Sequence, residues 1–297
     1  MEAIEIQKWK KAGEIAALLM RKALTLSKPE TPLLEIAEKI EQEAEKLKVK
    51  FAFPINLSID EIAAHYSPLY DDKTIASGLL KIDMGVSIDG FISDIARTVD
   101  LTAEGKYKEM IRVNEQALSG AIKTARYGVE VCEIGKTVQE IITSKGFSPV
   151  RNLCGHEMKQ YELHAGITIP NYDNNNKAKL QEGIYAIEPF ATTGIGIVQD
   201  RKPSGVYMLQ DEKKQVRDMK AREMLQFISK EYHTLPFSSR WLVKKYGLRA
   251  LLSLKFLEQQ EILHSFFQLV EKSGAPVSQC ENTIMIEKNK AVVLTAD

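Results

Sequence analysis

Three aspartates lie within the stretch IDMGVSIDGFISD, residues 82–94, whose other side chains are typical of a buried strand. Charged groups are seldom buried without a partner. The carboxylates in this stretch therefore either face water or surround a cation. Which of them are ligands depends on the face of the strand that each one occupies.

The pair Asp89-Gly90 is a strong signal for a two-residue type I′ hairpin turn. With these two residues at the turn, counting outward along the two strands places Asp94 opposite Gly85. Asp94 is then the diagonal neighbour of Asp83 on the same face, and diagonal neighbours lie roughly 7–8 Å apart. Two carboxylates at that distance reach a common cation, whereas Asp89 is confined to the turn. The ordinary alternative to a shared cation is that the sheet is covered on one face only and both carboxylates are exposed to solvent on the other face.

Three further segments carry a residue of metal-binding type among apolar side chains. His156 follows a glycine in NLCGHEMKQYELHAG, Glu188 follows the apolar run GIYAI, and Glu281 begins ENTIMIEK. Singly, each has an ordinary interpretation as a satisfied core histidine or a carboxylate at the surface end of a strand. Together with Asp83 and Asp94 they provide four carboxylates and one imidazole, a ligand set suited to two divalent ions.

Helices, strands and loops around these residues indicate an α+β fold. Residues 51–72, FAFPINLSIDEIAAHYSPLYDD, contain two prolines and are predicted to form loops and short extended pieces. Residues 150–190 are predicted to form short strands and turns, with the polar run NYDNNNKAKLQEG as a surface loop, and the carboxyl-terminal ENTIMIEKNKAVVLTAD returns to strands. Helical periodicity is predicted over about 5–27, 31–48, 106–127 and 133–145, and in the charged segments VRDMKAREMLQFISKEY and RALLSLKFLEQQEILHSFFQLVEK. The simplest organisation is one α+β domain interrupted by a helical insertion at roughly 200–270.

Charge and cysteine content limit the classes of partner. The chain has 40 Lys plus Arg and 40 Asp plus Glu, so its net charge gives no reason to expect a nucleic-acid or membrane partner. Its first residues are acidic and amphipathic, unlike a signal peptide, and no apolar run reaches the roughly 18 residues of a membrane span. Cys132, Cys154 and Cys280 fit neither a disulfide framework nor a thiolate zinc site, which indicates a cytoplasmic location.

Several segments in a fixed order carry a resemblance to a known family. They are FPINLSIDEIAAHYSP, KIDMGVSIDGFISDIARTVD, GHEMKQYELHAGITIPN, EGIYAIEPFAT, LPFSSRW and ENTIMIEK, and they span nearly the whole chain. The sequence resembles the type II methionine aminopeptidases of archaea and eukaryotes, which have the pita-bread fold of creatinase and the aminopeptidases. The resemblance implies a catalytic domain of two pseudo-two-fold halves over residues 1–199 and 271–297, and a helical, winged-helix-like insertion over 200–270.

The resemblance also implies a role for each proposed ligand. Asp83 would chelate one metal, Asp94 and Glu281 would bridge both metals, and His156 and Glu188 would complete the other. The expected cofactors are two divalent ions, with cobalt, manganese, iron and zinc all open because carboxylate-rich sites accept each of them. A hydroxide between the ions is the expected nucleophile, and Glu188 the expected proton carrier.

The substrate implied by the resemblance is the amino-terminal methionine of a nascent polypeptide whose second residue is small. His65 and His164 match the two histidines that contact the scissile peptide and stabilise the tetrahedral intermediate. Phe53, Leu163 and Phe190 match positions that line the methionine side-chain pocket. A monomer without a membrane or specific nucleic-acid partner is expected.

One position departs from the family pattern. Relatives usually have Glu-His-Thr at the last ligand, whereas this chain has Glu281-Asn282-Thr283. Because side chains alternate along a strand, Asn282 is expected to point away from the metals and to affect how the ligand strand is held. Cys280 is expected to be a small buried apolar residue rather than a redox switch.

Two other functions stay open at the level of sequence. An X-Pro dipeptidase of the same fold commonly carries a separate amino-terminal domain and lacks the insertion, and a non-enzymatic binding protein of this fold would have lost ligands that this chain keeps. The basic segments WLVKKYGLR and KAREMLQFISK leave a transient ribosome contact open, although solvated helix faces are the favoured interpretation.

Overall fold

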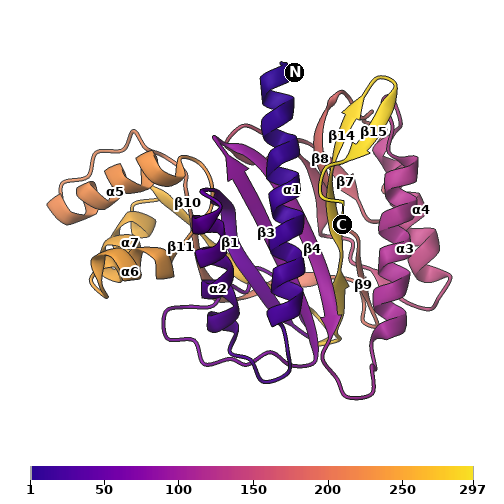
Figure 1. The fold of residues 1–297 in the computed structure, drawn as a ribbon, viewed down its shortest axis with the longest axis horizontal. Helices are drawn as coiled ribbons and strands as arrows, with labels where there is room; N and C mark the ends of the chain where they lie inside the picture. Colours follow the sequence, from indigo (N-terminus) through magenta and orange to yellow (C-terminus); the bar gives the residue numbers. More distant parts are fainter. Residues whose placement is uncertain (1, 297) are drawn as a thin grey trace.

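The computed structural model describes residues 2–296 as an α+β chain (Figure 1). Its helices are α1 (Ala3–Leu26), α2 (Leu33–Lys46), α3 (Lys108–Thr124), α4 (Val131–Thr143), α5 (Met219–Tyr232), α6 (Ser239–Tyr246) and α7 (Ala250–Gln259). Its strands are β1 (Lys50–Ile59), β2 (Ile62–Ala64), β3 (Leu79–Ile88), β4 (Phe91–Asp100), β5 (Ser148–Pro149), β6 (Cys154–Lys159), β7 (Glu162–Pro170), β8 (Gly183–Ile187), β9 (Phe190–Thr192), β10 (Val198–Leu209), β11 (Phe237–Ser238), β12 (Leu263–Glu271), β13 (Val277–Gln279), β14 (Glu281–Glu287) and β15 (Lys290–Val293). Within residues 2–296, no helix is both long and apolar enough to cross a membrane.

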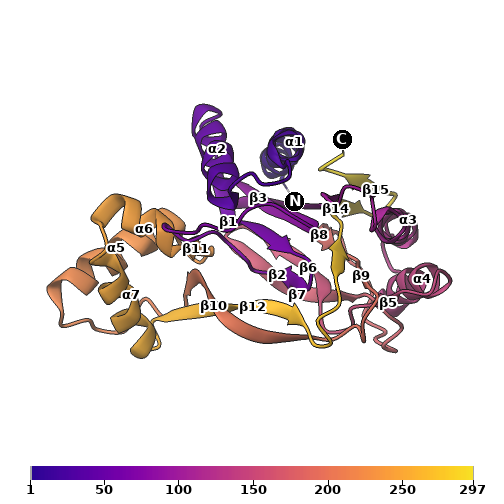
Figure 2. The ribbon, with the colours of Figure 1, turned by 90° about the horizontal axis from the view of Figure 1, so that it is seen from below.

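An antiparallel sheet in the order β1-β3-β4-β14-β8-β6-β7 forms the centre of the molecule. Helices α1 and α2 cover β1, β3 and β4 on the face opposite to β10 and β12 (Figure 2). Helices α3 and α4 pack against each other and bury a second cluster against β7, β8 and β14. The sheet is therefore covered by helices on one side and faces β10 and β12 with the other.

The β3–β4 hairpin has the predicted register, with Asp94 opposite Gly85 and Asp83 opposite Ala96. Asp89 and Gly90 both have positive φ angles, 52° and 85°, as a type I′ turn requires. The apolar face of the hairpin, Ile82, Met84, Val86 and Ile95, is fully buried under α1 and α2.

Burial of those four side chains is also what holds the register. Each contributes roughly 1.5–3 kcal/mol when fully buried. A slip by one residue would exchange the two faces, moving the apolar side chains out and Asp83 and Asp94 into the helix-covered core. The aspartates are therefore kept on the uncovered face of the sheet.

Pro54 does not end the strand, contrary to the prediction of loops over residues 51–72. It lies within β1, an edge strand whose pairing with β3 shifts register between Phe53 and Asn56. Proline is tolerated at an edge or a bulge because no ladder hydrogen bond is required from it there. The remainder of the segment contains β2 and loops, as predicted.

The prediction of a continuous helix over residues 249–272 is wrong in its second half. Helix α7 ends at Gln259, Glu261 takes a left-handed φ of 53°, and the chain continues as β12. Strand β12 pairs with β10 on one edge and β2 on the other, so hydrogen bonds to distant segments decide its conformation.

Helices α5, α6 and α7 form a lobe at one end of the molecule (Figure 1). The lobe has its own hydrophobic cluster, which includes Ile228, Leu242 and Leu254. It is tied to α2 by the buried ion pair of Arg240 with Glu41, at 2.7 Å. The lobe is thus connected to the sheet through β10 and β12 and through this ion pair.

Candidate metal centre

A cavity of about 300 Å³ lies between the uncovered face of the central sheet and β10 and β12. Its lining includes the β12 side chains Phe266 and Leu269, which the sequence had assigned to a helix. Every side chain predicted for the site lines it: Phe53, His65, Asp83, Asp94, His156, Leu163, His164, Glu188, Phe190 and Glu281.

The order of strands brings the five predicted ligands together. Asp83 is on β3, Asp94 on β4, Glu281 on β14 and His156 on β6, while Glu188 follows the last residue of β8. These strands are successive neighbours in the order β3-β4-β14-β8-β6. Each strand therefore delivers one ligand beside the ligand of the next, although the residues are far apart in sequence.

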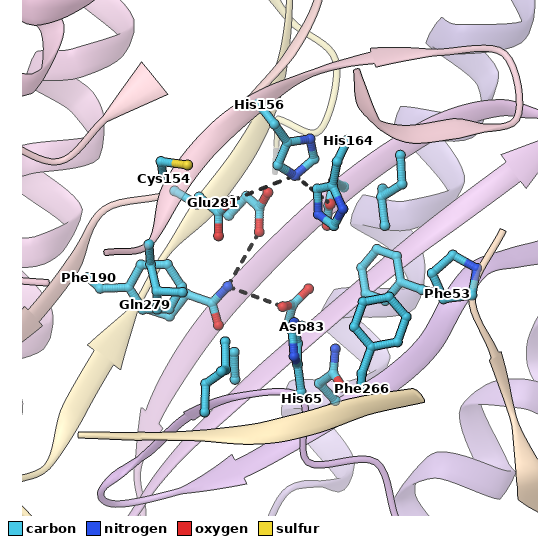
Figure 3. Close-up of a pocket in the computed structure, with 18 of the residues that line it drawn as sticks. Phe53, His65, Asp83, Cys154, His156, His164, Phe190, Phe266, Gln279 and Glu281 are labelled. Atoms are coloured by element: carbon cyan, nitrogen blue, oxygen red, sulfur yellow. Dashed lines mark hydrogen bonds and ion pairs between the residues drawn. The ribbon is translucent and has the colours of Figure 1, made fainter. Parts of the chain in front are cut away.

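His156 lies close to two of the carboxylates. Its Nε2 is 3.8 Å from Asp94 Oδ2 and 3.6 Å from Glu188 Oε1. One ligand atom from each of Asp94, His156 and Glu281 lies within 4.8 Å of the others. Asp83 is joined to Glu281 through the amide of Gln279 (Figure 3).

The carboxylates of this cluster fit a cation. Asp83 Oδ1, Asp94 Oδ1 and Glu281 Oε1 are buried and have no hydrogen-bond partner among the described residues. No Lys or Arg is among the described residues that line the cavity. Buried carboxylates without partners are costly, so the donor set fits divalent cations.

Burial and mutual repulsion also shift the pKa values of these groups. Burial raises the pKa of Asp83 to about 7, against a smaller opposing effect of the hydrogen bond from Gln279. Burial, followed by repulsion from neighbouring carboxylates, raises the pKa of Asp94, Glu188 and Glu281 well above the ordinary range. Burial lowers the pKa of His156 to about 3, so its imidazole is neutral, as a metal ligand must be.

His65 is held in a strained conformation at the opposite wall. Its φ is 65°, in the left-handed region that a residue other than glycine adopts only when its surroundings impose it. Its Nδ1 lies 3.2 Å from the carbonyl oxygen of Phe267 on β12, and its ring packs edge to face against Phe266. Desolvation lowers the pKa of His65 to about 4, so the ring is neutral.

The second histidine predicted to contact the substrate stands beside the metal ligands. The ring of His164 is 4.5 Å from that of His156, edge to face, and burial lowers the pKa of His164. In Figure 3, Phe190 lies on one side of the carboxylates and Phe53 on the other. The polar groups therefore occupy the middle of a cavity with apolar ends.

Several residues that support the ligands were missed in the sequence. The hydroxyl of Thr283 accepts a hydrogen bond from Asp94 N, at 2.6 Å, and donates one to Asp94 O, at 2.8 Å. Asn171 donates to the carbonyl of Glu188, at 3.1 Å, and Asn114 to that of Pro189, at 2.9 Å. No local sequence pattern marks these contacts.

Gln279 was missed as well, although a signal was available for it. It stands two residues before Glu281, so strand alternation gives it the same face. Its side chain lines the cavity and contacts two of the predicted ligands.

Asn282 faces away from the cavity. Its side-chain oxygen accepts hydrogen bonds from Arg97 Nη2, at 3.1 Å, and from the Thr295 hydroxyl, at 3.0 Å. Arg97 Nη1 also donates to the carbonyl oxygen of Glu281, at 2.7 Å. Asn282 thus acts on the strand that carries Glu281 and lies behind the ligand, while Cys280 is buried in the apolar cluster beneath α3.

Comparison with known proteins adds to this geometry. Residues 7–224 match metallopeptidase family M24. The chain is 43% identical over 297 residues to a methionine aminopeptidase of Pyrococcus horikoshii, covering 98% of this chain and 100% of that protein.

Solved structures show the fold. That of a thermophilic Arx1 superposes with a TM-score of 0.84 at 16% identity, covering 99% of this chain and 91% of that one. That of a methionine aminopeptidase of Thermotoga maritima superposes with a TM-score of 0.71 at 23% identity, covering 100% and 98%. These likenesses confirm the predicted pita-bread fold.

Proposed function

The chain belongs to the methionine aminopeptidases of metallopeptidase family M24 and is a hydrolase, and from this premise we propose that it removes the initiator methionine from nascent proteins whose second residue is small. The observation that carries the proposal is the delivery of one ligand from each of several neighbouring strands into a single cavity with apolar ends. A carboxylate cluster without a binding function would not be expected in a cavity with apolar ends.

We propose that Asp83, Asp94, His156, Glu188 and Glu281 hold two divalent ions, with Asp94 and Glu281 in contact with both. Three of these carboxylates each keep one buried oxygen without a hydrogen-bond partner among the described residues, as ligands require. When bound, the ions supply Lewis acidity, which polarises the scissile carbonyl and lowers the pKa of water toward neutrality.

The tautomer of His65 follows from its partner. A carbonyl oxygen only accepts hydrogen bonds, so His65 Nδ1 must carry the proton that is donated to Phe267 O. Because the ring is neutral, Nε2 is left as an acceptor. We propose that Nε2 accepts the N–H of the scissile peptide and so orients the leaving amine.

His164 and Glu188 complete the proposed machinery. His164 is neutral and has one N–H that can donate to the carbonyl oxygen as negative charge develops there. The side chain of Glu188 is 14% exposed and lines the cavity, so it keeps access to both water and substrate. It would take a proton from the attacking water and pass it to the leaving amine.

The apolar ends of the cavity set the proposed specificity. Phe53, Leu163 and Phe190 would contribute apolar lining for the unbranched methionine side chain, and Phe266 and Leu269 of β12 add to that lining. A volume of about 300 Å³ admits the end of a peptide and excludes its folded continuation. The geometry thus supports removal of one terminal residue.

The experiment compares two peptides, Met-Ala-Ser and Ala-Pro, with metal-free enzyme and added manganese, iron, cobalt or zinc. We expect release of methionine from the first peptide only, and Asp94→Ala should abolish it. Cleavage confined to the proline peptide would indicate an X-Pro dipeptidase. No cleavage with any ion would indicate a binding protein.

The biological setting follows from the substrate. Nascent chains leave the ribosome in the cytoplasm, so we propose a cytoplasmic monomer with a transient ribosome contact. Residues 200–270 would form the insertion subdomain, which the separate hydrophobic cluster of α5, α6 and α7 supports.

A further inference from the structure

Gln279, at the end of β13, lies between two carboxylates of the metal centre. Its side chain is buried, with 1% of the residue exposed. The amide Nε2 donates to Asp83 Oδ2, at 3.1 Å, and to Glu281 Oε2, at 3.5 Å (Figure 3). The reverse orientation of the amide would set its oxygen against both carboxylates, so the hydrogen-bond partners fix which end of the amide faces them.

The main chain of Gln279 is fixed from the other side. The hydroxyl of Thr98 on β4 accepts a hydrogen bond from Gln279 N, at 2.9 Å, and donates one to Gln279 O, at 2.5 Å. Gln279 is also paired with Phe190 in the ladder between β13 and β9. The amide is therefore presented from a backbone that two neighbouring strands hold.

The two oxygens of each carboxylate, in Asp83 and in Glu281, differ in whether they accept a hydrogen bond, and this difference indicates the role of the Gln279 amide. In both Asp83 and Glu281, one oxygen accepts from Gln279, and the other is buried with no partner among the described residues. An amide nitrogen has two hydrogens, one for each carboxylate. Each carboxylate is thereby held by one oxygen and keeps the other oxygen for a ligand.

The chemistry of glutamine suits this place better than the alternatives. A lysine or arginine here would neutralise the charge that attracts a divalent ion, and an acidic residue would add to the repulsion between carboxylates. A neutral donor orients both groups without cancelling their charge. Residues that hydrogen-bond to metal ligands in this way tune affinity as strongly as some ligands do.

We propose that Gln279 is a positioning residue, which holds Asp83 and Glu281 in the orientation that binds their shared ion. The inference rests on the proposed function, in which Glu281 serves both ions, Asp83 serves only one of them, and His156 and Glu188 complete the other. Loss of the amide should therefore weaken binding of the ion that Asp83 and Glu281 share, where two ligands lose their support, more than binding of the other ion, where only Glu281 does.

The test is calorimetric titration of metal-free protein with Mn²⁺, which needs no substrate. Gln279→Met keeps the length of the side chain and removes both donors. We expect one of two binding steps to weaken about 10- to 100-fold and the other to weaken clearly less. In a His156→Ala background, which disables the second ion, the remaining step should carry the whole effect. Thermal unfolding of the metal-free proteins checks that each variant is folded.

Ser278→Ala is the matched control, because Ser278 is equally buried on the same strand and contacts neither carboxylate. Should Gln279→Met not fold, Gln279→Asn replaces it, since its shorter amide cannot span both carboxylates and should show the same selective loss. Unchanged binding in the variant, or an equal loss in both steps, overturns the inference. Failure of the wild-type protein to bind Mn²⁺ overturns the proposed function along with it, which separates the two failures.

Discussion

The ion pair between Arg240 and Glu41 should be among the most sensitive contacts of the fold. Both guanidinium ends bond the carboxylate at 2.7 Å, and the side chains are only 3% and 12% exposed. The indole N–H of Trp241 donates to the same carboxylate at 2.6 Å, and Arg240 Nε donates to the carbonyl of Pro68 at 2.9 Å. One carboxylate on α2 thus holds the helical lobe, and the same arginine holds the loop that follows His65.

The perturbation is Glu41→Gln, which leaves the guanidinium buried without a counter-charge. Removing one partner of a buried pair costs about 3–5 kcal/mol. For a chain of this size, about 2 °C of melting temperature corresponds to each kcal/mol, so Tm should fall by about 6–10 °C. Differential scanning calorimetry of the metal-free protein measures this fall.

Glu35→Gln on α2 is the control, because Glu35 pairs with Lys39 on the surface of the same helix. Exposed pairs contribute little, and Tm should fall by about 1 °C or less. Replacing Glu41 and Arg240 together by methionine should recover most of the loss, since no charge is then left unpaired. A fall for Glu41→Gln no larger than that for Glu35→Gln would refute the reasoning that burial gives this pair its weight.

Three further changes test other parts of the structure. Adding Mn²⁺ to metal-free enzyme at about 100 times its Kd should stabilise the fold by about 2.7 kcal/mol in a urea titration, and no stabilisation would contradict a site formed by the folded chain. A Cβ at Gly85 would lie 2.5 Å from the ring of Phe53. Gly85→Ala should therefore push that ring into the cavity and raise KM for Met-Ala-Ser more than it lowers kcat. An unchanged KM would place the ring outside the substrate site. Burial raises the pKa of the Glu271 carboxyl, but hydrogen bonds from Ser273, Ala275 and Gly196 outweigh it, and the net pKa lies below 4.5. The stability that Glu271 adds is thus complete above its unfolded-state pKa and is lost as pH falls through the lower folded-state pKa. The destabilisation caused by Glu271→Gln should therefore shrink below about pH 4.5. A difference in stability between wild type and variant that grew on acidification would contradict this sign.

The hairpin could be predicted because its information is local. A turn that requires two positive φ angles favours Asp89-Gly90, and strand alternation then assigns every side chain to a face. The two aspartates of the cavity follow from that register. The other three candidate ligands lie on or next to strands distant in sequence, so residue type could group them with the pair, but only the family resemblance gave each of them a role.

The parts that could not be predicted depend on distant partners. Strand β12 looks helical in isolation, and its conformation is set by pairing with β10 and β2. Phe266 and Leu269 were therefore not expected in the cavity wall. Similarly, nothing near Pro54 shows that β1 is an edge strand, where proline is tolerated.

The lobe of helices α5, α6 and α7 looks like a module that could be exchanged for another, but the strands on either side of it limit where a chimera can be joined. Val206 on β10 and Phe266 on β12 are part of the cavity wall, so a graft cut at residues 200 and 270 would carry part of that wall with it. A junction between Leu209 and Leu263 would keep Val206, Phe266 and Leu269 in place, provided that the incoming segment supplies a counterpart of Pro236 in the cavity lining and the partner of Glu41. The exchangeable part is therefore smaller than the lobe looks, because the segment contributes to the cavity at both ends and at Pro236.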